Sequence, residues 1–273
     1  MVASESLQYL VLGILQGIFE WLPVSSDGVL VLVKANFFPD SSSLAQLMKL
    51  ILFLHLGTFL AALVYLRKDV WGVCKTLVKY PKASAGEKKL FNFLLLSTII
   101  TGLMGFGILT YLETSELNVL TAGRAITLFV GFLLLGTASI QLRARGSGNK
   151  TAADLGSSDS TFLGLGQGLA TLPGISRSGI TTAFLMLRNY DKRETLRISF
   201  LMSLPVVLAG NIFLNFSILT QPFSPIFLYG LLSSFVFGLL TIHALMKLAE
   251  RINFGWFVLI FGVLTVLSGL FFI

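Results

Sequence analysis

Long apolar stretches separated by short polar segments make up most of the sequence. Six of these stretches approach or reach the length of about 20 residues that an α-helix needs to cross a bilayer. They predict membrane-spanning helices over residues 50–66, 90–112, 125–142, 198–219, 225–246 and 252–273. Two further apolar stretches, 7–33 and 161–187, are interrupted by polar residues and contain Pro23 and Pro173. Such interruptions are typical of broken or re-entrant helical hairpins rather than of simple spans.

The two interruptions resemble each other. The first runs from Gln16 to Gly28 and the second from Gln167 to Gly179, and both contain Gln-Gly, then Leu-Pro, then serines and glycine. This echo predicts an internal repeat, with the two polar segments meeting near the membrane midplane between the halves. The predicted single membrane domain is 1–273, and its approximate halves are 1–142 and 143–273.

Lysine and arginine are concentrated in four of the polar segments. These segments hold 16 of the 20 basic residues, and they are 67–89, 143–160, 188–197 and the connection from Lys247 to Arg251. Because cytoplasmic loops retain basic residues preferentially, we expect all four segments on the cytoplasmic side. The residues left near the outer side are Lys34, Lys49, Glu113, Glu116 and Arg124.

This orientation constrains the two interrupted stretches. Basic segments flank 161–187 on both sides, so that stretch must enter and leave the membrane from the inside, whereas 7–33 must do so from the outside. The sequence therefore predicts an all-α polytopic membrane protein with six transmembrane helices and two re-entrant helical hairpins in an inverted-topology repeat.

The composition agrees with a membrane protein and excludes other classes. Charged residues make up 12% of the chain, against about 25% in soluble domains. The net charge of +7 does not indicate nucleic acid, because the basic residues lie between apolar stretches, where they set topology and contact anionic headgroups. Cys74 is the single cysteine, which excludes an intrachain disulfide, and we expect it to be a loop or interfacial residue. Glu5 precedes the first apolar stretch and no basic segment does, so we expect that stretch to remain in the mature protein.

Arg177 is informative because a charge inside a membrane stretch needs a partner. Its planar guanidinium suits two phosphate oxygens and keeps its charge at working pH. Glycines around it permit exposed backbone amides, and neighbouring hydroxyl groups add donors, which together favour an anion-binding nest. The predicted nest residues are Gly174, Ser176, Arg177, Ser178, Gly179 and Thr181.

Glu20 is a carboxylate in an apolar stretch, where it is costly unless it is paired, hydrated or metal-bound. Arg177 is one structural partner, and the functional alternatives are a general base or a ligand for Mg²⁺ or Ca²⁺. Gln16 lies four residues earlier, on the same helix face, where its carboxamide oxygen could complete the cation site or orient water. A hydrogen bond to a neighbouring helix would equally explain Gln16.

Five further polar residues are candidates or alternatives. Ser25 and Ser26 could contact phosphate or supply a nucleophile activated by the nearby carboxylate, although serines in membrane helices often bond a helix carbonyl. Asp27 is a second ligand or base, or lies at a hydrated hairpin tip. His55 and His243 are each more simply explained as hydrogen-bonded packing residues.

The segments QGIFEWLPVSSDG (16–28) and PGISRSG (173–179) together resemble the two signature motifs of the undecaprenyl-diphosphate phosphatase family, also called the bacitracin-resistance family. The resemblance extends over the whole chain. It implies an integral enzyme of the plasma membrane that removes the terminal phosphate from a polyprenyl diphosphate of the undecaprenyl type, recycling the lipid monophosphate carrier for cell-envelope glycans. It also implies a divalent cation, an active site open to the outer face, and six spanning helices with two re-entrant hairpins.

The resemblance implies which residues of this chain correspond to the family's functional residues. The matching positions are Gln16, Glu20, Ser26, Ser176, Arg177 and Thr181. The family usually has a catalytic histidine where this chain has Val29. Three interpretations follow: Asp27 or His55 replaces the histidine, catalysis runs through Glu20 and metal-bound water, or phosphatase activity has been lost.

The sequence leads to the hypothesis of a phosphatase. In it, Arg177 and the hairpin amides hold the phosphates, and Glu20 with Gln16 binds a cation or positions the general base. Ser26, or else Ser176, contacts or attacks the terminal phosphorus. The rival is a polyprenyl-phosphate carrier or flippase without chemistry, which inverted repeats would also suit. A purely structural subunit would leave Arg177 and Glu20 unexplained. The sequence leaves open the lipid, the cation and the oligomeric state, a homodimer included.

Overall fold

The computed structural model describes residues 2–38, 42–114, 123–144, 148–216, 225–248 and 254–271. Within these ranges the chain is helical and has no β-strand, as the sequence predicts. The helices of the first half are α1 (Val2–Phe19), α2 (Ser26–Phe37), α3 (Leu44–Tyr65), α4 (Arg67–Val78), α5 (Ala85–Thr114) and α6 (Gly123–Arg143). Those of the second half are α7 (Ser157–Leu169), α8 (Arg177–Leu187), α9 (Lys192–Leu214), α11 (Pro225–Leu248) and α12 (Phe254–Phe271).

Four helices are long and apolar enough to cross a membrane, namely α3, α5, α9 and α11. The other two predicted spans are also helical, but their apolar parts within the described residues are shorter, at Thr127–Arg143 in α6 and Val258–Leu270 in α12. The predicted span 198–219 overlaps α9, which ends at Leu214. Residues 217–219, 252, 253, 272 and 273 of the predicted spans lie outside the described residues.

Both interrupted stretches form pairs of helices joined by a turn. α1 and α2 are joined by the turn that contains Pro23, and α7 and α8 by the turn that contains Pro173. α2 begins at the N-cap Ser25, whose hydroxyl accepts a hydrogen bond from the amide of Gly28. α8 begins in the same way at Ser176, which accepts from the amide of Gly179. In each pair a serine cap starts the second helix, which explains why both polar segments contain serine followed by glycine.

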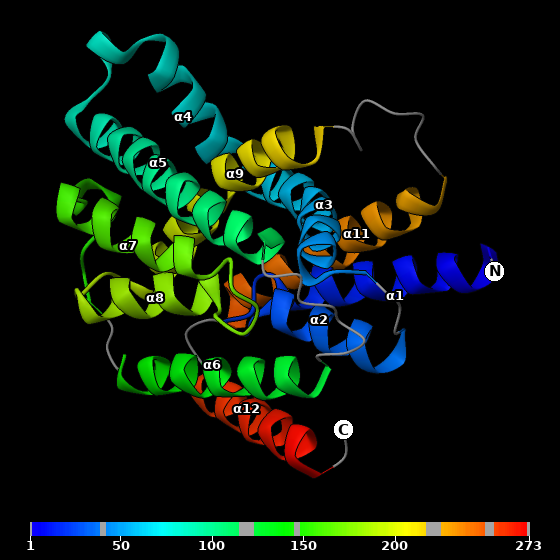
Figure 1. The fold of residues 1–273 in the computed structure, drawn as a ribbon. Helices are drawn as coiled ribbons and strands as arrows, with labels where there is room; N and C mark the ends of the chain where they lie inside the picture. Colours follow the sequence, from blue (N-terminus) through cyan, green and yellow to red (C-terminus); the bar gives the residue numbers. More distant parts are fainter. Residues whose placement is uncertain are drawn as a thin grey trace.

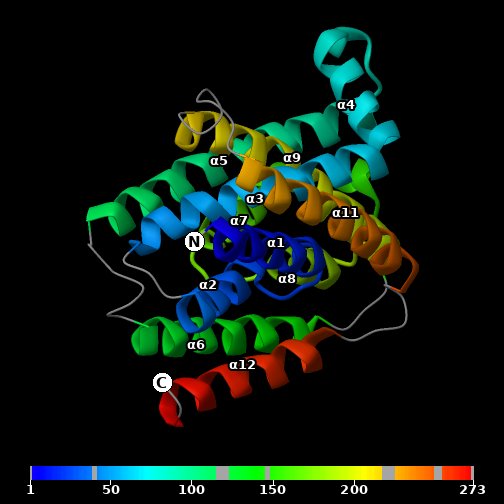
Figure 2. The same ribbon diagram turned by 90° about the vertical axis from the view of Figure 1, so that its right-hand side faces the viewer.

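The helix pairs are embedded in the opposite half of the chain. α1 packs mainly along α11, and α7 packs mainly along α5, while α3 and α9 contact each other near the middle. α6 and α12 pack together as a layer on one side of the molecule (Figures 1 and 2). Figure 1 shows α1 and α7 reaching the centre from opposite ends. The turn of each helix pair therefore lies inside the molecule.

Charged residues gather at one end of the bundle, where three of the basic segments meet. Arg197 at the start of α9 pairs with Asp69 in α4 at 2.6 Å, and Lys89 donates to the carbonyl of Ala153 at 2.9 Å. Asp159 accepts from the hydroxyl of Tyr190 at 3.0 Å, and burial, with the Asp159 carboxylate alongside, raises the pKa of Tyr190. These contacts join 67–89, 143–160 and 188–197 as the charge pattern requires.

The other end carries the residues expected on the outer side. Lys49 pairs with Glu113 at 2.5 Å, and Arg124 donates to the carbonyl of Gly269 at 3.0 Å near the end of α12. Of the other residues used for the orientation, Arg145, Glu116 and Arg251 lie outside the described residues.

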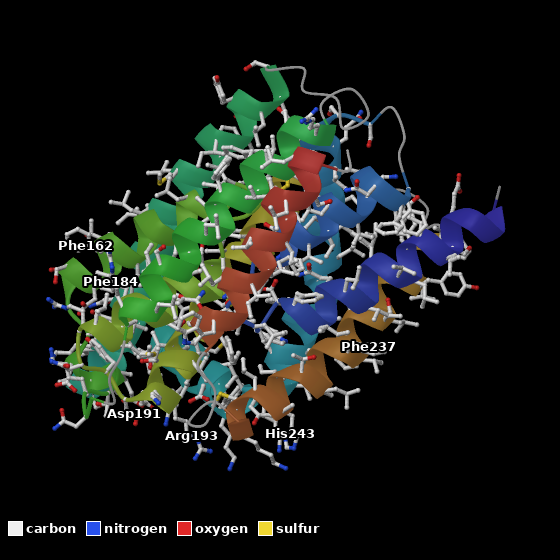
Figure 3. The ribbon with its side chains drawn as sticks, turned by 90° about the horizontal axis from the view of Figure 1, so that it is seen from below. Phe162, Phe184, Asp191, Arg193, Phe237 and His243 are labelled. Carbon is white, nitrogen blue, oxygen red and sulfur yellow. The ribbon has the colours of Figure 1, made fainter. Side chains whose placement is uncertain are left out.

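Aromatic side chains pack against each other between neighbouring helices. In Figure 3, Phe162 on α7 lies beside Phe184 on α8, with ring centroids 5.8 Å apart. His243 on α11 makes an edge contact with the ring of Tyr65 at 6.0 Å between centroids. This contact agrees with the expectation that His243 is a packing residue.

Candidate active site

The turns of the two helix pairs are bonded to each other. The Ser25 hydroxyl accepts from the amide of Gly174 at 3.0 Å in addition to that of Gly28, and the Ser178 hydroxyl donates to the carbonyl of Leu22 at 2.7 Å. Gly174 has φ +103°, a left-handed conformation that favours glycine, and an added Cβ would lie 2.8 Å from the carbonyl oxygen of Val130. The sequence motif is therefore required for the two turns to meet.

Glu20 lies at the centre of this junction. It follows the last residue of α1, and only 5% of its surface is exposed. Its Oε1 accepts a hydrogen bond from Nη2 of Arg177, and its Oε2 accepts from Nε2 of Gln16 at 2.9 Å and from Oγ of Ser26 at 3.0 Å. An ion pair and two further donors thus compensate for burying the carboxylate.

Arg177 is the first residue of α8 and connects the two halves of the junction. Besides pairing with Glu20, it donates from Nη1 to the backbone carbonyl of Ser199 in α9 at 3.1 Å. Its side chain is 15% exposed, and it lines a cavity. The guanidinium is thus held in place while part of it remains accessible to a ligand.

His55 and Asp27 complete the cluster. Nε2 of His55 lies 3.0 Å from Oε2 of Glu20 and 3.5 Å from Oδ1 of Asp27. Nδ1 of His55 lies 2.8 Å from the carbonyl oxygen of Ile51. Because a carbonyl can only accept, Nδ1 carries a proton, and Nε2 is the nitrogen that faces the two carboxylates. The sequence favoured packing for His55, and its contacts instead place the ring in the polar cluster.

Val29 stands where the resemblance leads us to expect a histidine. The residue is on α2, is 4% exposed, and belongs to a hydrophobic cluster with Leu30 and Val31. That position is therefore apolar in this chain, whereas an imidazole reaches the cluster from α3.

The remaining nest residues make bonds within the scaffold. Ser176 caps α8, and the Thr181 hydroxyl donates to the carbonyl of Arg177 at 2.8 Å and shares a 2.6 Å hydrogen bond with the hydroxyl of Ser199. Gly179 has no room for a side chain, because a Cβ there would lie 2.3 Å from Nε2 of Gln141. The phosphate contacts expected for Ser25, Gly174, Ser176, Ser178, Gly179 and Thr181 stay predictions.

Three buried polar residues near the junction were not predicted from the sequence as site residues. Ser199 accepts from Arg177, Gln141 donates to the carbonyl of Pro23, and Gln167 donates from Nε2 to the hydroxyl of Thr101 at 3.2 Å. The echo of Gln16 could have indicated Gln167. Ser199 and Gln141 have no local signal, because their roles depend on which helices pack together.

A cavity of about 630 Å³ opens beside the polar cluster. Asp27, His55 and Arg177 contribute to its polar part. Its apolar wall comes from α3, α5 and α9, and includes Ile51, Leu52, Leu103, Phe106, Val206 and Phe213. The cavity therefore joins a charged end to an apolar space, a shape suited to an amphipathic ligand with an anionic head.

The predicted cation site on Gln16 and Glu20 is not preassembled. Gln16 directs its Nε2, not its oxygen, at Glu20, and Glu20 already accepts from Gln16, Ser26 and Arg177. Among the described residues, no group of three or more His, Cys, Asp or Glu could hold a metal ion. Asp27, by contrast, lines the cavity, and both of its contacts there, with Ser26 and His55, are at 3.5 Å. The oxygens of Asp27 thus have longer contacts than those of Glu20 and lie beside the cavity, and the bound cation stays a prediction.

Comparisons with known proteins agree with the geometry. The family model described as bacitracin resistance protein BacA matches residues 9–267. A protein of Methanococcoides burtonii named undecaprenyl-diphosphatase is 37% identical over 95% of this chain and 96% of its own length. Proteins of the same name from Methanothrix thermoacetophila (36% identical, 96% of each chain) and Korarchaeum cryptofilum (34%, 95% of this chain and 97% of its own) are also similar.

Proposed function

Because the chain belongs to the bacitracin resistance protein BacA family, we propose that it is a membrane phosphatase that hydrolyses the terminal phosphate of an undecaprenyl-type polyprenyl diphosphate. The product is the lipid monophosphate carrier. The observation that supports this most directly is the position of Arg177, which pairs with Glu20 at the junction of the two turns and lines a cavity with a mainly apolar wall. A diphosphate head and a prenyl tail together match those two surfaces.

The chain is a multi-pass membrane protein, and its detailed topology is part of the proposal. We propose six spanning helices and two re-entrant hairpins in halves 1–142 and 143–273, located in the plasma membrane with the site open to the outer face. Packing of α1 on α11 and of α7 on α5 supports an inverted repeat, because each hairpin then lies against the corresponding helix of the other half.

Binding of the diphosphate rests on three sources of positive potential. Arg177 lines the cavity, and the helices α2 and α8 both begin at the junction, at Ser26 and Arg177. Helix N-termini favour anions because their amides are free and their dipoles point outward. A divalent cation, Mg²⁺ or Ca²⁺, would be held by Asp27 and would neutralise charge on the phosphate oxygens.

Ser26 is the proposed nucleophile. Its Oγ already donates to Glu20, which accepts the proton as Oγ bonds to the terminal phosphorus and the bond from phosphorus to the bridging oxygen breaks. Lipid monophosphate leaves, and water then hydrolyses the phosphoserine to inorganic phosphate. His55 takes the place of the family histidine, because its Nε2 lies within 3.0 Å of Glu20 and can exchange a proton at that point.

The decisive experiment measures phosphate release from undecaprenyl diphosphate by the purified protein, with and without Mg²⁺ or Ca²⁺. Glu20→Gln and Arg177→Ala should each lower the rate by about 100-fold or more, because both remove fixed charge at the reacting group. Exposed Lys82→Ala is the matched control and should leave the rate unchanged. Absence of release by the unmodified protein would refute the phosphatase and favour a lipid-phosphate carrier.

A further inference from the structure

Helix α4 has an apolar surface that the other described residues leave exposed. Trp71 is 73% exposed, Leu77 64% and Val78 79%, and Cys74 is exposed between them. Trp71, Cys74 and Val78 follow one another at intervals of three and four residues, so they lie on one face of the helix. The sequence alone treats this segment as a basic connection and does not predict the helix.

The orientation of α4 on the bundle is set by its other faces. Asp69 pairs with Arg197 of α9, and Thr76 is buried. Val70 and Val73 pack against the hydrophobic cluster of α5, α7 and α9. These contacts direct the exposed stripe away from the protein. In both Figure 1 and Figure 2, α4 lies at the edge of the bundle and projects beyond the other helices.

Basic residues border the stripe. Lys68 and Lys75 are exposed and lie seven residues apart on the adjoining face, and Lys79 follows the end of the helix. The single acidic residue of α4, Asp69, is already engaged with Arg197. A surface that combines a tryptophan and aliphatic side chains with flanking lysines is complementary to an anionic lipid interface.

The position of α4 in the chain places it next to such an interface. α3 and α5 both have the length and composition of membrane spans, and α4 begins two residues after α3 ends. We propose that α4 is an interfacial helix that binds the anionic phospholipid surface on the basic side of the membrane, with Trp71, Cys74 and Val78 inserted and Lys68, Lys75 and Lys79 at the headgroups. This surface is separate from the candidate active site.

Cys74 allows a direct test, because it is the single cysteine and lies on the stripe. A nitroxide attached to Cys74 reports depth through its relative accessibility to oxygen and to a water-soluble nickel chelate. The protein is reconstituted in phosphatidylcholine vesicles with and without phosphatidylglycerol. The aqueous reference is Lys82→Cys in a Cys74→Ser background, because Lys82 is exposed beyond the helix.

The label at Cys74 should lie just below the headgroups, and phosphatidylglycerol should increase its burial relative to the aqueous reference. Substituting Lys68, Lys75 and Lys79 by Gln should weaken that lipid dependence by about fivefold for each lysine removed. A label as accessible to the nickel chelate as the aqueous reference in both membranes would overturn the proposal. Spin–spin broadening that disappears on dilution with unlabelled protein would also overturn it, since a second copy would then cover the stripe.

Discussion

At the scale of single residues, Glu20 determines how the site is assembled, because Gln16, Ser26 and Arg177 all donate to it. A buried carboxylate with this many donors cannot be removed without leaving several of them unpaired. Its neighbour His55 adds the imidazole that the motif position at Val29 lacks. The cluster thus contains an imidazole from α3, and the proposal that it serves the role of a histidine at position 29 is open to test.

Exchanging these two positions tests that proposal. His55→Gln should lower phosphate release by about 10²- to 10⁴-fold, the usual contribution of general acid–base catalysis. Val29→His in the His55→Gln background should restore part of the rate if the two positions serve one role. Measuring the pH profile of kcat for each variant separates a catalytic loss from a folding defect. Full activity in His55→Gln alone would exclude His55 from proton transfer.

Gly174 should be intolerant of any side chain. Gly174→Ala places a Cβ 2.8 Å from the Val130 carbonyl oxygen and forces φ near +103° on alanine. The strain should cost about 1–3 kcal/mol and separate the two turns. Thermal unfolding in detergent, together with phosphate release, measures both effects. Gly72→Ala in α4, where no atom lies within 4 Å of the added Cβ, is the matched control.

At the scale of elements, the serine caps join local helix formation to tertiary structure. Ser176 satisfies one amide in its own helix, whereas Ser25 satisfies the amide of Gly28 and that of Gly174 from the other half. The Ser25 cap therefore stabilises both the start of its own helix and the contact between the two turns.

Alanine substitutions at the three serine caps should therefore differ in how much they lower the stability of the protein. Ser43→Ala, at the exposed capping box of α3, should lower stability by about 0.5–1 kcal/mol, and Ser176→Ala by about 1 kcal/mol. Ser25→Ala should cost more than either, because it leaves two buried amides without their acceptor. Denaturation midpoints of the three variants in one detergent give the order. Equal losses at Ser25 and Ser43 would contradict the assigned link between the turns.

At the scale of the whole molecule, the two ends of the bundle differ in the charged residues that they carry. The Arg197–Asp69 pair lies at one end and the Lys49–Glu113 pair at the other. The majority of basic residues belong to the first end, which the positive-inside rule assigns to the cytoplasm.

Labelling with a membrane-impermeant maleimide tests this orientation. In a Cys74→Ser background, Lys82→Cys should react only in inside-out vesicles and Glu113→Cys only in right-side-out vesicles. Both positions are exposed, so a lack of reaction reports sidedness and not burial. The reverse pattern would invert the proposed topology and turn the active site toward the cytoplasm.

The sequence by itself determined the helical class and the position of most helices. It also indicated Gln16, Glu20, Ser26 and Arg177, which the structure brings together. These features are local, because apolar length, N-cap serines, glycine turns and intramembrane charges act within a few residues. It did not predict α4, whose inward face is recognisable only once Asp69 meets Arg197.

The tertiary structure alone decided which partners these residues have. It brought His55 of α3 beside Glu20 and placed Ser199 and Gln141 at the junction. It also made Arg177 the ionic partner of Glu20, with Gln16 and Ser26 as further donors. These outcomes depend on how α3, α6 and α9 pack against two turns that are 149 residues apart, as in the bond from Gly174 to Ser25. Such contacts leave no periodic pattern in the sequence, because they depend on long-range packing between helices and not on neighbouring residues.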